Sequence, residues 1–148
     1  MKKEWVDYFL EIAETIKSKS KDRNTKIGAL IVGDNKEIVS TGYNSFPRGI
    51  DDSVEERQQR PEKYYWFEHA ERNAIYNAAL IGVSTKGKKM FLTCGVPCTD
   101  CARGIISSGI SEIWCKKEDT TRNKELWSEH SKRSVMMFNE AGIKINYY

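Results

Sequence analysis

The segment 88–115, KKMFLTCGVPCTDCARGIISSGISEIWC, predicts a strand, a helix and a second strand in that order. Residues 88–93 and 111–115 have the apolar character of buried strands. Residues 98–108 have the composition of a helix, and Gly109 follows them at the position where glycine commonly ends a helix. This alternation of strand and helix is typical of the α/β class, in which helices cover a central sheet.

The residues on both sides of this segment extend the alternation. Apolar residues at three- and four-residue steps predict an amphipathic helix over 5–16, which ends near Ser18. The other expected elements are a hairpin of strands 27–32 and 37–41, a helix over 68–81 ended by Gly82, a helix over 131–141 ended by Gly142, and a last strand over 143–147. This order, α-β-β-α-β-α-β-α-β, predicts a three-layer α/β/α sandwich with a central mixed sheet of five strands.

Length and composition favour one soluble domain. The chain has 148 residues, of which 39% are hydrophobic, so we expect a single domain over 1–148. Its 24 basic and 21 acidic residues are dispersed, which does not indicate a nucleic acid polymer as partner. No run approaches the roughly 20 apolar residues of a membrane span, and residues 1–4 lack the apolar region of a signal peptide. We therefore expect a cytoplasmic protein without a membrane partner.

A long polar stretch separates the hairpin from the next helix. Residues 42–63 contain Gly, Pro, Asn and many charges without a clear period. A loop of this length is unusual in a small domain and is often functional. We interpret it as a binding loop.

Two short motifs, HAE at 69–71 and PCTDC at 97–101, each lie where a helix is predicted to begin. Residues three apart on a helix are separated by roughly 60° around the axis, so Cys98 and Cys101 can direct both sulfurs to one point. With the imidazole of His69 they suit Zn²⁺ and leave its fourth tetrahedral position for water, as catalytic zinc sites require. The sequence therefore predicts one zinc ion held by these three residues.

Other interpretations of the same residues are a redox pair or half of a structural zinc site. A structural site would need a fourth Cys or His, but His130 lies far along the chain. Cys94 and Cys115 lie in apolar strand patterns, which indicates buried thiols, although Cys94 is the strongest candidate for a further ligand. Glu71 is about 200° around an ideal helix from His69, which suits a proton shuttle beside the bound water better than a fourth ligand.

Together the two motifs match the His-x-Glu and Pro-Cys-x-x-Cys signature of zinc nucleobase deaminases. Further segments are KIGALIV at 26–32, GYNSFPRG at 42–49 followed by Asp51 and Asp52, HAERNAI at 69–75 and PCTDCA at 97–102. On these segments nearly the whole chain resembles the deoxycytidylate (dCMP) deaminase family of the cytidine deaminase superfamily.

The resemblance implies a hydrolase that converts dCMP to dUMP and ammonia in pyrimidine deoxynucleotide metabolism. Hydroxide on zinc attacks C4, and Glu71 passes protons to N3 and to the departing ammonia. Asn44 contacts the sugar or base, and the backbone of Ala70 reads the pyrimidine edge. Cations before the first strand meet the phosphate, for which Arg23 is the first choice and Lys21 the second.

Family members are commonly homohexamers that dCTP activates and that dTTP inhibits together with Mg²⁺. By resemblance, the effector site here involves Tyr43, Asn44, Phe46, Arg48, Gly49 and Asp51. Some members bind a second, structural zinc through a cysteine after the glycine of this loop. Ile50 occupies that position, so one zinc is expected. The following loop, 51–63, could serve an effector, a neighbouring subunit or no ligand, and the aromatic run 64–67 either packs or stacks on a base.

Several alternatives stay open at this point. Residues 116–121 replace the aromatic-basic pair that often holds the substrate in this family, so CMP and dCTP are alternative substrates. Arg122, in the same region, is a weaker candidate for the phosphate. Deamination of a base in tRNA or single-stranded DNA is a second function, for which a basic channel with exposed aromatic residues would be required. A non-catalytic zinc protein that binds nucleotides is a third.

Overall fold

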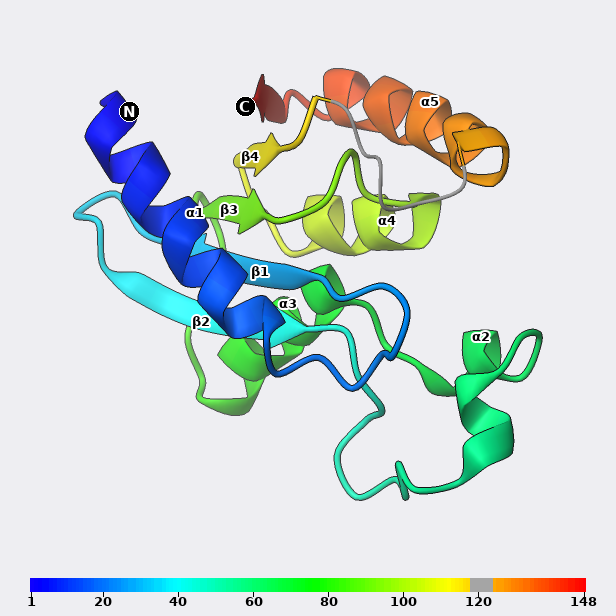
Figure 1. The fold of residues 1–148 in the computed structure, drawn as a ribbon. Coiled ribbons are helices and arrows are strands. Elements are labelled where there is room, and N and C mark those ends of the chain that lie inside the picture. The colour runs from blue at the N-terminus through cyan, green and yellow to red at the C-terminus, as the bar shows by residue number, and fades with distance from the viewer. Residues whose placement is uncertain (118–123) are drawn as a thin grey trace.

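A five-stranded mixed sheet in the order β2-β1-β3-β4-β5 forms the middle layer of the molecule (Figure 1). The structure is a computed structural model that describes residues 1–117 and 124–148. The strands are β1 (Gly28–Val32), β2 (Ile38–Tyr43), β3 (Lys89–Leu92), β4 (Glu112–Cys115) and β5 (Lys144–Tyr147). β1 is antiparallel to β2 and β3, whereas β3, β4 and β5 are mutually parallel. The expected mixed sheet is therefore confirmed.

Helices cover the two faces of the sheet unequally. The helices are α1 (Lys3–Lys17), α2 (Lys63–Trp66), α3 (Ala70–Leu80), α4 (Thr99–Ser107) and α5 (Lys124–Glu140), with a 3-10 turn, η1, at Glu55–Gln58. Of the described helices, α1 packs on one face, where Phe9 meets Leu30 and Phe91. α3, α4 and α5 share the other face, which Met90 and Leu92 line. Alternate residues of β3 thus serve two cores, as the pleat of a strand requires. Within the described residues, no helix is both long and apolar enough to cross a bilayer.

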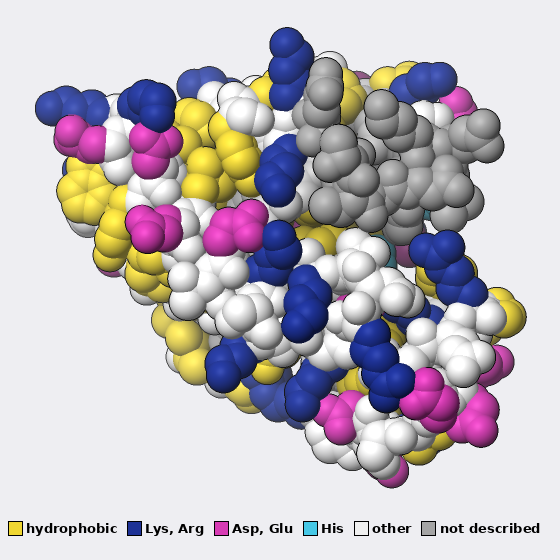
Figure 2. Space-filling view, in the orientation of Figure 1, with side chains coloured by type: hydrophobic (Ala, Val, Ile, Leu, Met, Phe, Trp, Pro, Cys, Tyr) yellow, Lys and Arg dark blue, Asp and Glu magenta, His cyan; other side chains and the backbone are white. Residues whose placement is uncertain are grey.

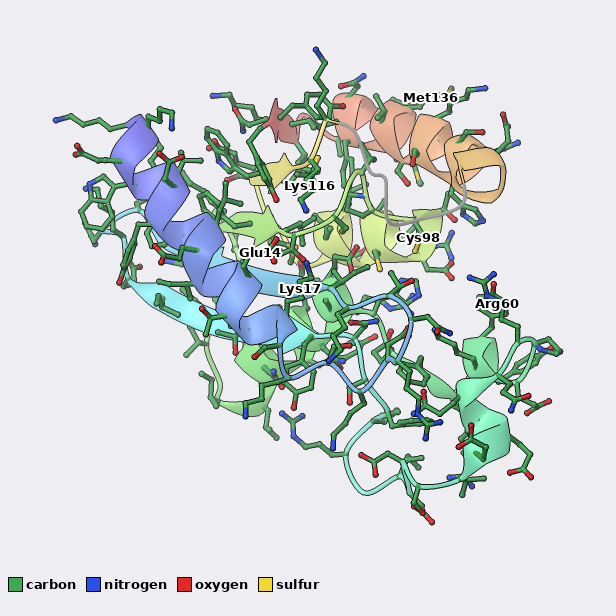
Figure 3. The ribbon with its side chains drawn as sticks, viewed as in Figure 1. Glu14, Lys17, Arg60, Cys98, Lys116 and Met136 are labelled. Atoms are coloured by element: carbon green, nitrogen blue, oxygen red, sulfur yellow. The ribbon has the colours of Figure 1, made fainter. Side chains whose placement is uncertain are left out.

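The C-terminal end of α1 is tied to the sheet by charge. Glu14 lies between Lys17, at 2.9 Å, and Lys116, at 3.7 Å (Figure 3). Lys116 directly follows β4, so the shared carboxylate connects α1 to the region where the parallel strands end. These pairs are partly exposed and contribute little energy, but they orient α1 over the sheet.

Most predicted elements are confirmed with small shifts at their ends. Gly82, Gly109 and Gly142 follow the helices that they were expected to end, and each has a φ between 71° and 76°, which glycine adopts without strain. The last helix begins at Lys124 and not at 131. The sequence did not indicate its first seven residues as helical, because they are mostly polar and show little apolar periodicity. The stretch 42–63 is also not entirely loop, since β2 continues to Tyr43 and η1 lies within it.

Gly42 allows α3 to lie directly on β2. A Cβ atom at Gly42 would lie 2.3 Å from the carbonyl oxygen of Ala70 and 2.3 Å from the amide nitrogen of Ala74. Real Cβ atoms do not approach backbone atoms this closely, so a larger residue would push the helix away from the strand. The missing side chain therefore fixes the height of the first turn of α3 above the sheet.

A Gly42→Ala variant is expected to lose about 1–3 kcal/mol of unfolding free energy, because the added methyl group overpacks the contact between two backbones. Gly104→Ala is the matched control, since its Cβ would make an ordinary contact 3.5 Å from Arg72 Cγ. Urea denaturation of both variants measures the difference. A Gly42→Ala protein as stable as the Gly104→Ala protein would contradict the assigned role of this glycine.

Candidate metal centre

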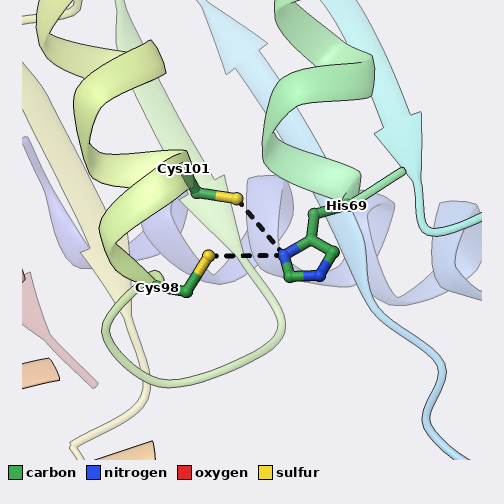
Figure 4. A group of neighbouring side chains, drawn as sticks. All are labelled: His69, Cys98 and Cys101. Atoms are coloured by element: carbon green, nitrogen blue, oxygen red, sulfur yellow. Dashed lines mark hydrogen bonds between the residues drawn. The ribbon is translucent and has the colours of Figure 1, made fainter. Parts of the chain in front are cut away.

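The first turns of α3 and α4 bring three potential metal ligands together (Figure 4). His69 is the N-cap residue of α3 and Cys98 is the N-cap residue of α4. Both residues have extended backbones, with ψ values of 152° and 167°, and each lies just before the first turn of its helix. Cys101 lies within the first turn of α4. The helices thus present one imidazole and two sulfurs at their positively polarised ends.

The distances among these ligand atoms fit a tetrahedral zinc ion. The Nδ1 atom of His69 lies 3.5 Å from the sulfur of Cys98 and 3.4 Å from that of Cys101. Zn–S bonds of about 2.3 Å and Zn–N bonds of about 2.0 Å, at a tetrahedral angle, place sulfur and nitrogen about 3.5 Å apart. All three ligand atoms lie within 4.8 Å of one another. Among the described residues, no other group of His, Cys, Asp and Glu atoms is this compact.

The electrostatics of the site favour the thiolate form at one of the two sulfur ligands, Cys98. A hydrogen bond from Cys101 lowers the pKa of the Cys98 thiol to about 3, and His69 adds to this effect. The same hydrogen bond, together with burial, raises the pKa of Cys101. Burial opposes a charge on His69, but its hydrogen bond to Cys98 and the negative charges of Glu71 and Cys98 together outweigh this effect and raise the pKa of the imidazole. A site that places a thiolate beside an imidazole suits a cation that takes sulfur and nitrogen ligands.

Arg72 lies behind the sulfur ligands and carries a fixed positive charge. Its Nε atom donates to Glu68 at 2.6 Å, and its Nη1 atom lies 3.8 Å from Asp100. Although burial opposes its charge, the nearby Cys101 sulfur and the bond to Glu68 raise the pKa of Arg72. The guanidinium therefore balances part of the negative charge that two thiolates bring to the site.

Glu71 supplies a buried carboxylate next to the three ligands without joining them. Its side chain is 2% exposed, and its charge raises the pKa values of His69 and Cys101. Its Oε1 atom lies 4.0 Å from the sulfur of Cys94. Among the described residues its Oε2 atom has no hydrogen-bond partner. A buried carboxylate oxygen is costly to leave unsatisfied, so this atom points to a group that the site binds.

The two remaining cysteines are buried, as expected. Cys94 is 1% exposed and Cys115 is fully buried, and neither belongs to the compact group of ligand atoms. His130 is closer to the site than its place in the sequence suggested. Its Nδ1 atom lies 3.0 Å from the Thr99 hydroxyl, in the first turn of α4. Sequence reasoning missed this contact, because only the packing of α5 on α4 creates it.

The side-chain amide of Asn44, the residue after β2, is fully engaged by the loop that joins α1 to β1. Its Oδ1 atom accepts hydrogen bonds from the Ile27 amide at 2.8 Å and the Ser20 hydroxyl at 2.6 Å. Its Nδ2 atom donates to the Thr25 carbonyl at 2.6 Å and to Asp22 at 3.3 Å. These four bonds use the whole capacity of an amide side chain. The predicted contact between Asn44 and a sugar or base stays a prediction, and it requires one of these bonds to be exchanged.

Lys and Arg side chains gather across the middle of the face drawn in Figure 2, over the loop that joins α1 to β1. Two of the cations in this loop are the predicted phosphate contacts, and both already pair with carboxylates. Arg23 lies 2.8 Å from Glu55, and Lys21 lies 3.1 Å from Asp52. All four side chains are about half exposed, so these pairs are weak enough for a phosphate to replace the carboxylates. Arg122 lies outside the described residues.

Some of the predicted effector residues line a cavity of about 90 Å³ beside α3. Tyr43, Phe46 and Arg48 line it, whereas Asn44, Gly49 and Asp51 do not. Its lining also includes Ser45, Asn73 and Asn77. The two asparagines are four residues apart and therefore lie on one side of α3. The sequence shows this spacing, but only the position of the helix shows that this side faces the cavity.

Comparisons with known proteins agree with this geometry. Residues 3–117 match the family described as "Cytidine and deoxycytidylate deaminase zinc-binding region". An uncharacterized deaminase of Aliivibrio fischeri is 37% identical over 143 residues, which are 97% of this chain and 92% of that protein. Human deoxycytidylate deaminase is 35% identical over 145 residues, which are 95% of this chain and 77% of that protein.

The fold also matches a solved structure. The apo dCMP deaminase of the cyanophage S-TIM5 superposes with a TM-score of 0.77 over 100% of both chains, at 24% sequence identity. This similarity confirms the cytidine deaminase-like arrangement of the sheet and its helices. With residues 3–117 matched to the family and relatives more than 30% identical over almost its full length, this chain belongs to the cytidine and deoxycytidylate deaminase family.

Proposed function

We propose that this protein hydrolyses dCMP to dUMP and ammonia, with one zinc ion as cofactor. The observation that carries the proposal is the unpartnered Oε2 atom of buried Glu71, beside one imidazole and two sulfurs spaced for zinc. A structural zinc site closes all four positions with side chains and needs no buried acid beside it. The similarity to human deoxycytidylate deaminase supports dCMP as the substrate.

His69, Cys98 and Cys101 would hold the zinc ion in this mechanism. When bound, zinc supplies a water whose pKa lies near neutrality, which makes it a nucleophile for C4 of the cytosine ring. Glu71 takes the proton that this water releases and gives it to N3 of the ring. Glu71 would then take the proton of the hydroxyl newly bonded to C4 and deliver it to the N4 amino group, so that C4 becomes a carbonyl as the C4–N4 bond breaks and ammonia leaves. Burial of Glu71 excludes solvent from both transfers.

Backbone and side-chain groups around the centre would orient the nucleotide. Ala70 is the first residue of α3, so its backbone N–H is among those that a helix leaves without an intrahelical partner. We assign it to the edge of the pyrimidine and Asn44 to the sugar or base. Arg23, supported by Lys21, binds the phosphate in place of Glu55.

Ammonia release from a panel of substrates tests this function. The panel contains dCMP, CMP, dCTP, deoxycytidine and single-stranded DNA, each at the same concentration of zinc-loaded protein. We expect the highest kcat/KM with dCMP. Turnover of DNA in preference to dCMP would show a polymer deaminase, and zinc-loaded protein that binds these nucleotides without turning any of them over would show a nucleotide-binding protein.

An Arg23→Ala variant is expected to raise the KM for dCMP about tenfold, because it removes a charge-assisted hydrogen bond to the phosphate. The kcat/KM for deoxycytidine, which lacks a phosphate, should change little. Steady-state kinetics on both substrates measure the split. An equal loss with both substrates would contradict a phosphate contact at this residue.

We further propose a homohexamer, located in the cytoplasm, formed from this single domain over 1–148. Support for assembly comes from large apolar side chains exposed at the end of α3, namely Tyr76, Leu80, Ile81 and Val83. Exposed apolar patches of this kind commonly mark protein interfaces. Light scattering coupled to size-exclusion chromatography measures the assembly, and a monomeric active enzyme would contradict it.

The cavity lined by Tyr43, Phe46 and Arg48 is our candidate for the effector site, for dCTP as activator and for dTTP as inhibitor, each with Mg²⁺. Arg48 donates to Asn77 across this cavity, which places a cation where a phosphate would need one. Titration calorimetry with each nucleotide, with and without Mg²⁺, tests the site. Reciprocal changes in dCMP affinity are expected, since allosteric coupling is symmetric.

A further inference from the structure

A buried ion pair, separate from the three metal ligands, joins the loop after α1 to the start of α2. Lys63, at the start of α2, pairs with Asp22 in the loop after α1, and the two side chains are only 11% and 5% exposed. The neighbouring pairs of Lys21 and Arg23 are about half exposed. A buried pair loses its hydration, so it persists only where further hydrogen bonds satisfy the charges.

The Asp22 carboxylate has those further bonds. Its Oδ1 atom accepts from the backbone amides of Asn24 at 2.8 Å and Thr25 at 3.0 Å. Its Oδ2 atom accepts from Asn44 Nδ2 and from Lys63. One carboxylate therefore connects the loop after α1, the residue after β2 and the first residue of α2.

This connection continues from Asn44 to the metal centre in two short steps. Ser45, next to Asn44, exchanges two backbone hydrogen bonds with Glu68, at 3.1 Å and 2.8 Å. The carboxylate of Glu68 then accepts from the backbone amide of His69 at 2.9 Å. Hydrogen bonds, linked covalently from Asn44 to Ser45 and through Glu68, thus connect the buried pair to the backbone of the histidine ligand.

The chain itself provides a second path between the same points. α2 leads from Lys63 to Phe67, whose ring packs on Phe46 with 4.3 Å between ring centroids. Glu68 and His69 follow directly. Residues 63–69 are therefore fixed at one end by the ion pair and at the other by the bridge between Ser45 and Glu68.

We propose that the buried Lys63–Asp22 pair is a positioning device for His69. By pinning α2 and the Asn44 amide together, it holds the segment 63–69 in place, so that the imidazole faces the two sulfurs of α4. This inference rests on the proposed zinc centre but not on the identity of the substrate. It assigns a function to two charged residues that precede His69 in the sequence, Lys63 by 6 residues and Asp22 by 47.

Zinc release tests the proposal directly. Lys63→Met is expected to speed the transfer of zinc to a chromophoric chelator about tenfold, as loss of groups that orient metal ligands commonly does. Amide hydrogen exchange at Ser45 and Glu68 should accelerate in the same variant. Lys63→Arg, which keeps the charge, should restore slow release. Lys3→Met, which removes an equally simple but exposed pair with Asp7, should have no effect.

Two further measurements keep the result unambiguous. The double variant Asp22→Asn, Lys63→Met leaves no unpaired buried charge, so it should fold even if Lys63→Met does not, and it should still release zinc faster than the wild type. Zinc release at the wild-type rate in the folded variants, even with a lower urea midpoint, would overturn the proposal. Because release is measured without substrate, a protein that holds zinc but does not turn over dCMP would contradict only the proposed function.

Discussion

A Glu71→Gln variant is expected to bind zinc as the wild type does and to lose kcat for dCMP by about 10²–10⁴-fold, the usual contribution of a general acid and base. Glutamine has nearly the same shape as glutamate, so it fills the same buried space. It cannot accept and return a proton at neutral pH. The metal ligands stay untouched, because Glu71 is not part of the compact ligand group.

Elemental analysis for zinc and single-turnover kinetics check this result together. Glu4→Gln, at an exposed position on α1, is the matched control and should leave both measurements unchanged. A smaller Glu71→Ala variant should behave like Glu71→Gln, with zinc retained and turnover lost. Loss of zinc or unfolding in both variants would show that Glu71 serves the metal or the core and not proton transfer.

Replacing Cys101 by serine is expected to lower zinc affinity by about 10²–10⁴-fold and to abolish turnover. Structural zinc sites bind with about 10–16 kcal/mol in total, so one of three protein ligands accounts for several kcal/mol. A serine hydroxyl stays protonated at neutral pH and is a poor ligand for zinc. The Cys98 thiolate would also lose the hydrogen bond from Cys101 that lowers its pKa.

Competition with a chelator of known affinity measures the loss. Cys115→Ser is the matched control, because Cys115 is equally buried, in β4, but lies outside the ligand group. That variant should be less stable and yet keep its zinc. Normal zinc affinity in Cys101→Ser would exclude Cys101 from the ligand set.

The metal centre was largely predictable from sequence because its geometry is local. Cys98 and Cys101 are three residues apart at a helix start, and His69 lies at another, so two helix starts facing each other suffice to bring the three ligands together. The helix ends at Gly82, Gly109 and Gly142 were equally predictable, since each depends on the backbone freedom of one residue.

The surroundings of the centre could not be predicted in the same way. Asn44 was expected to face the substrate, yet all four hydrogen bonds of its side chain go to one loop, residues 20–27, that lies far from it in sequence. Nothing in the residues near Lys63 indicates that it pairs with Asp22, because that contact depends on how a long loop folds back. Such contacts follow from tertiary packing, on which local periodicity carries no information.

The separation of the ligands along the chain has a consequence beyond chemistry. His69 lies 29 residues from Cys98 and 32 from Cys101. A bound ion would therefore close a loop that contains α3 and β3, and ligands this far apart come together only in the folded chain, so zinc binding stabilises the fold. Free zinc at a thousand times its dissociation constant would add about 4.1 kcal/mol of resistance to unfolding. A shortage of zinc would therefore lower the fraction of protein that is folded, in addition to leaving the folded protein without its metal.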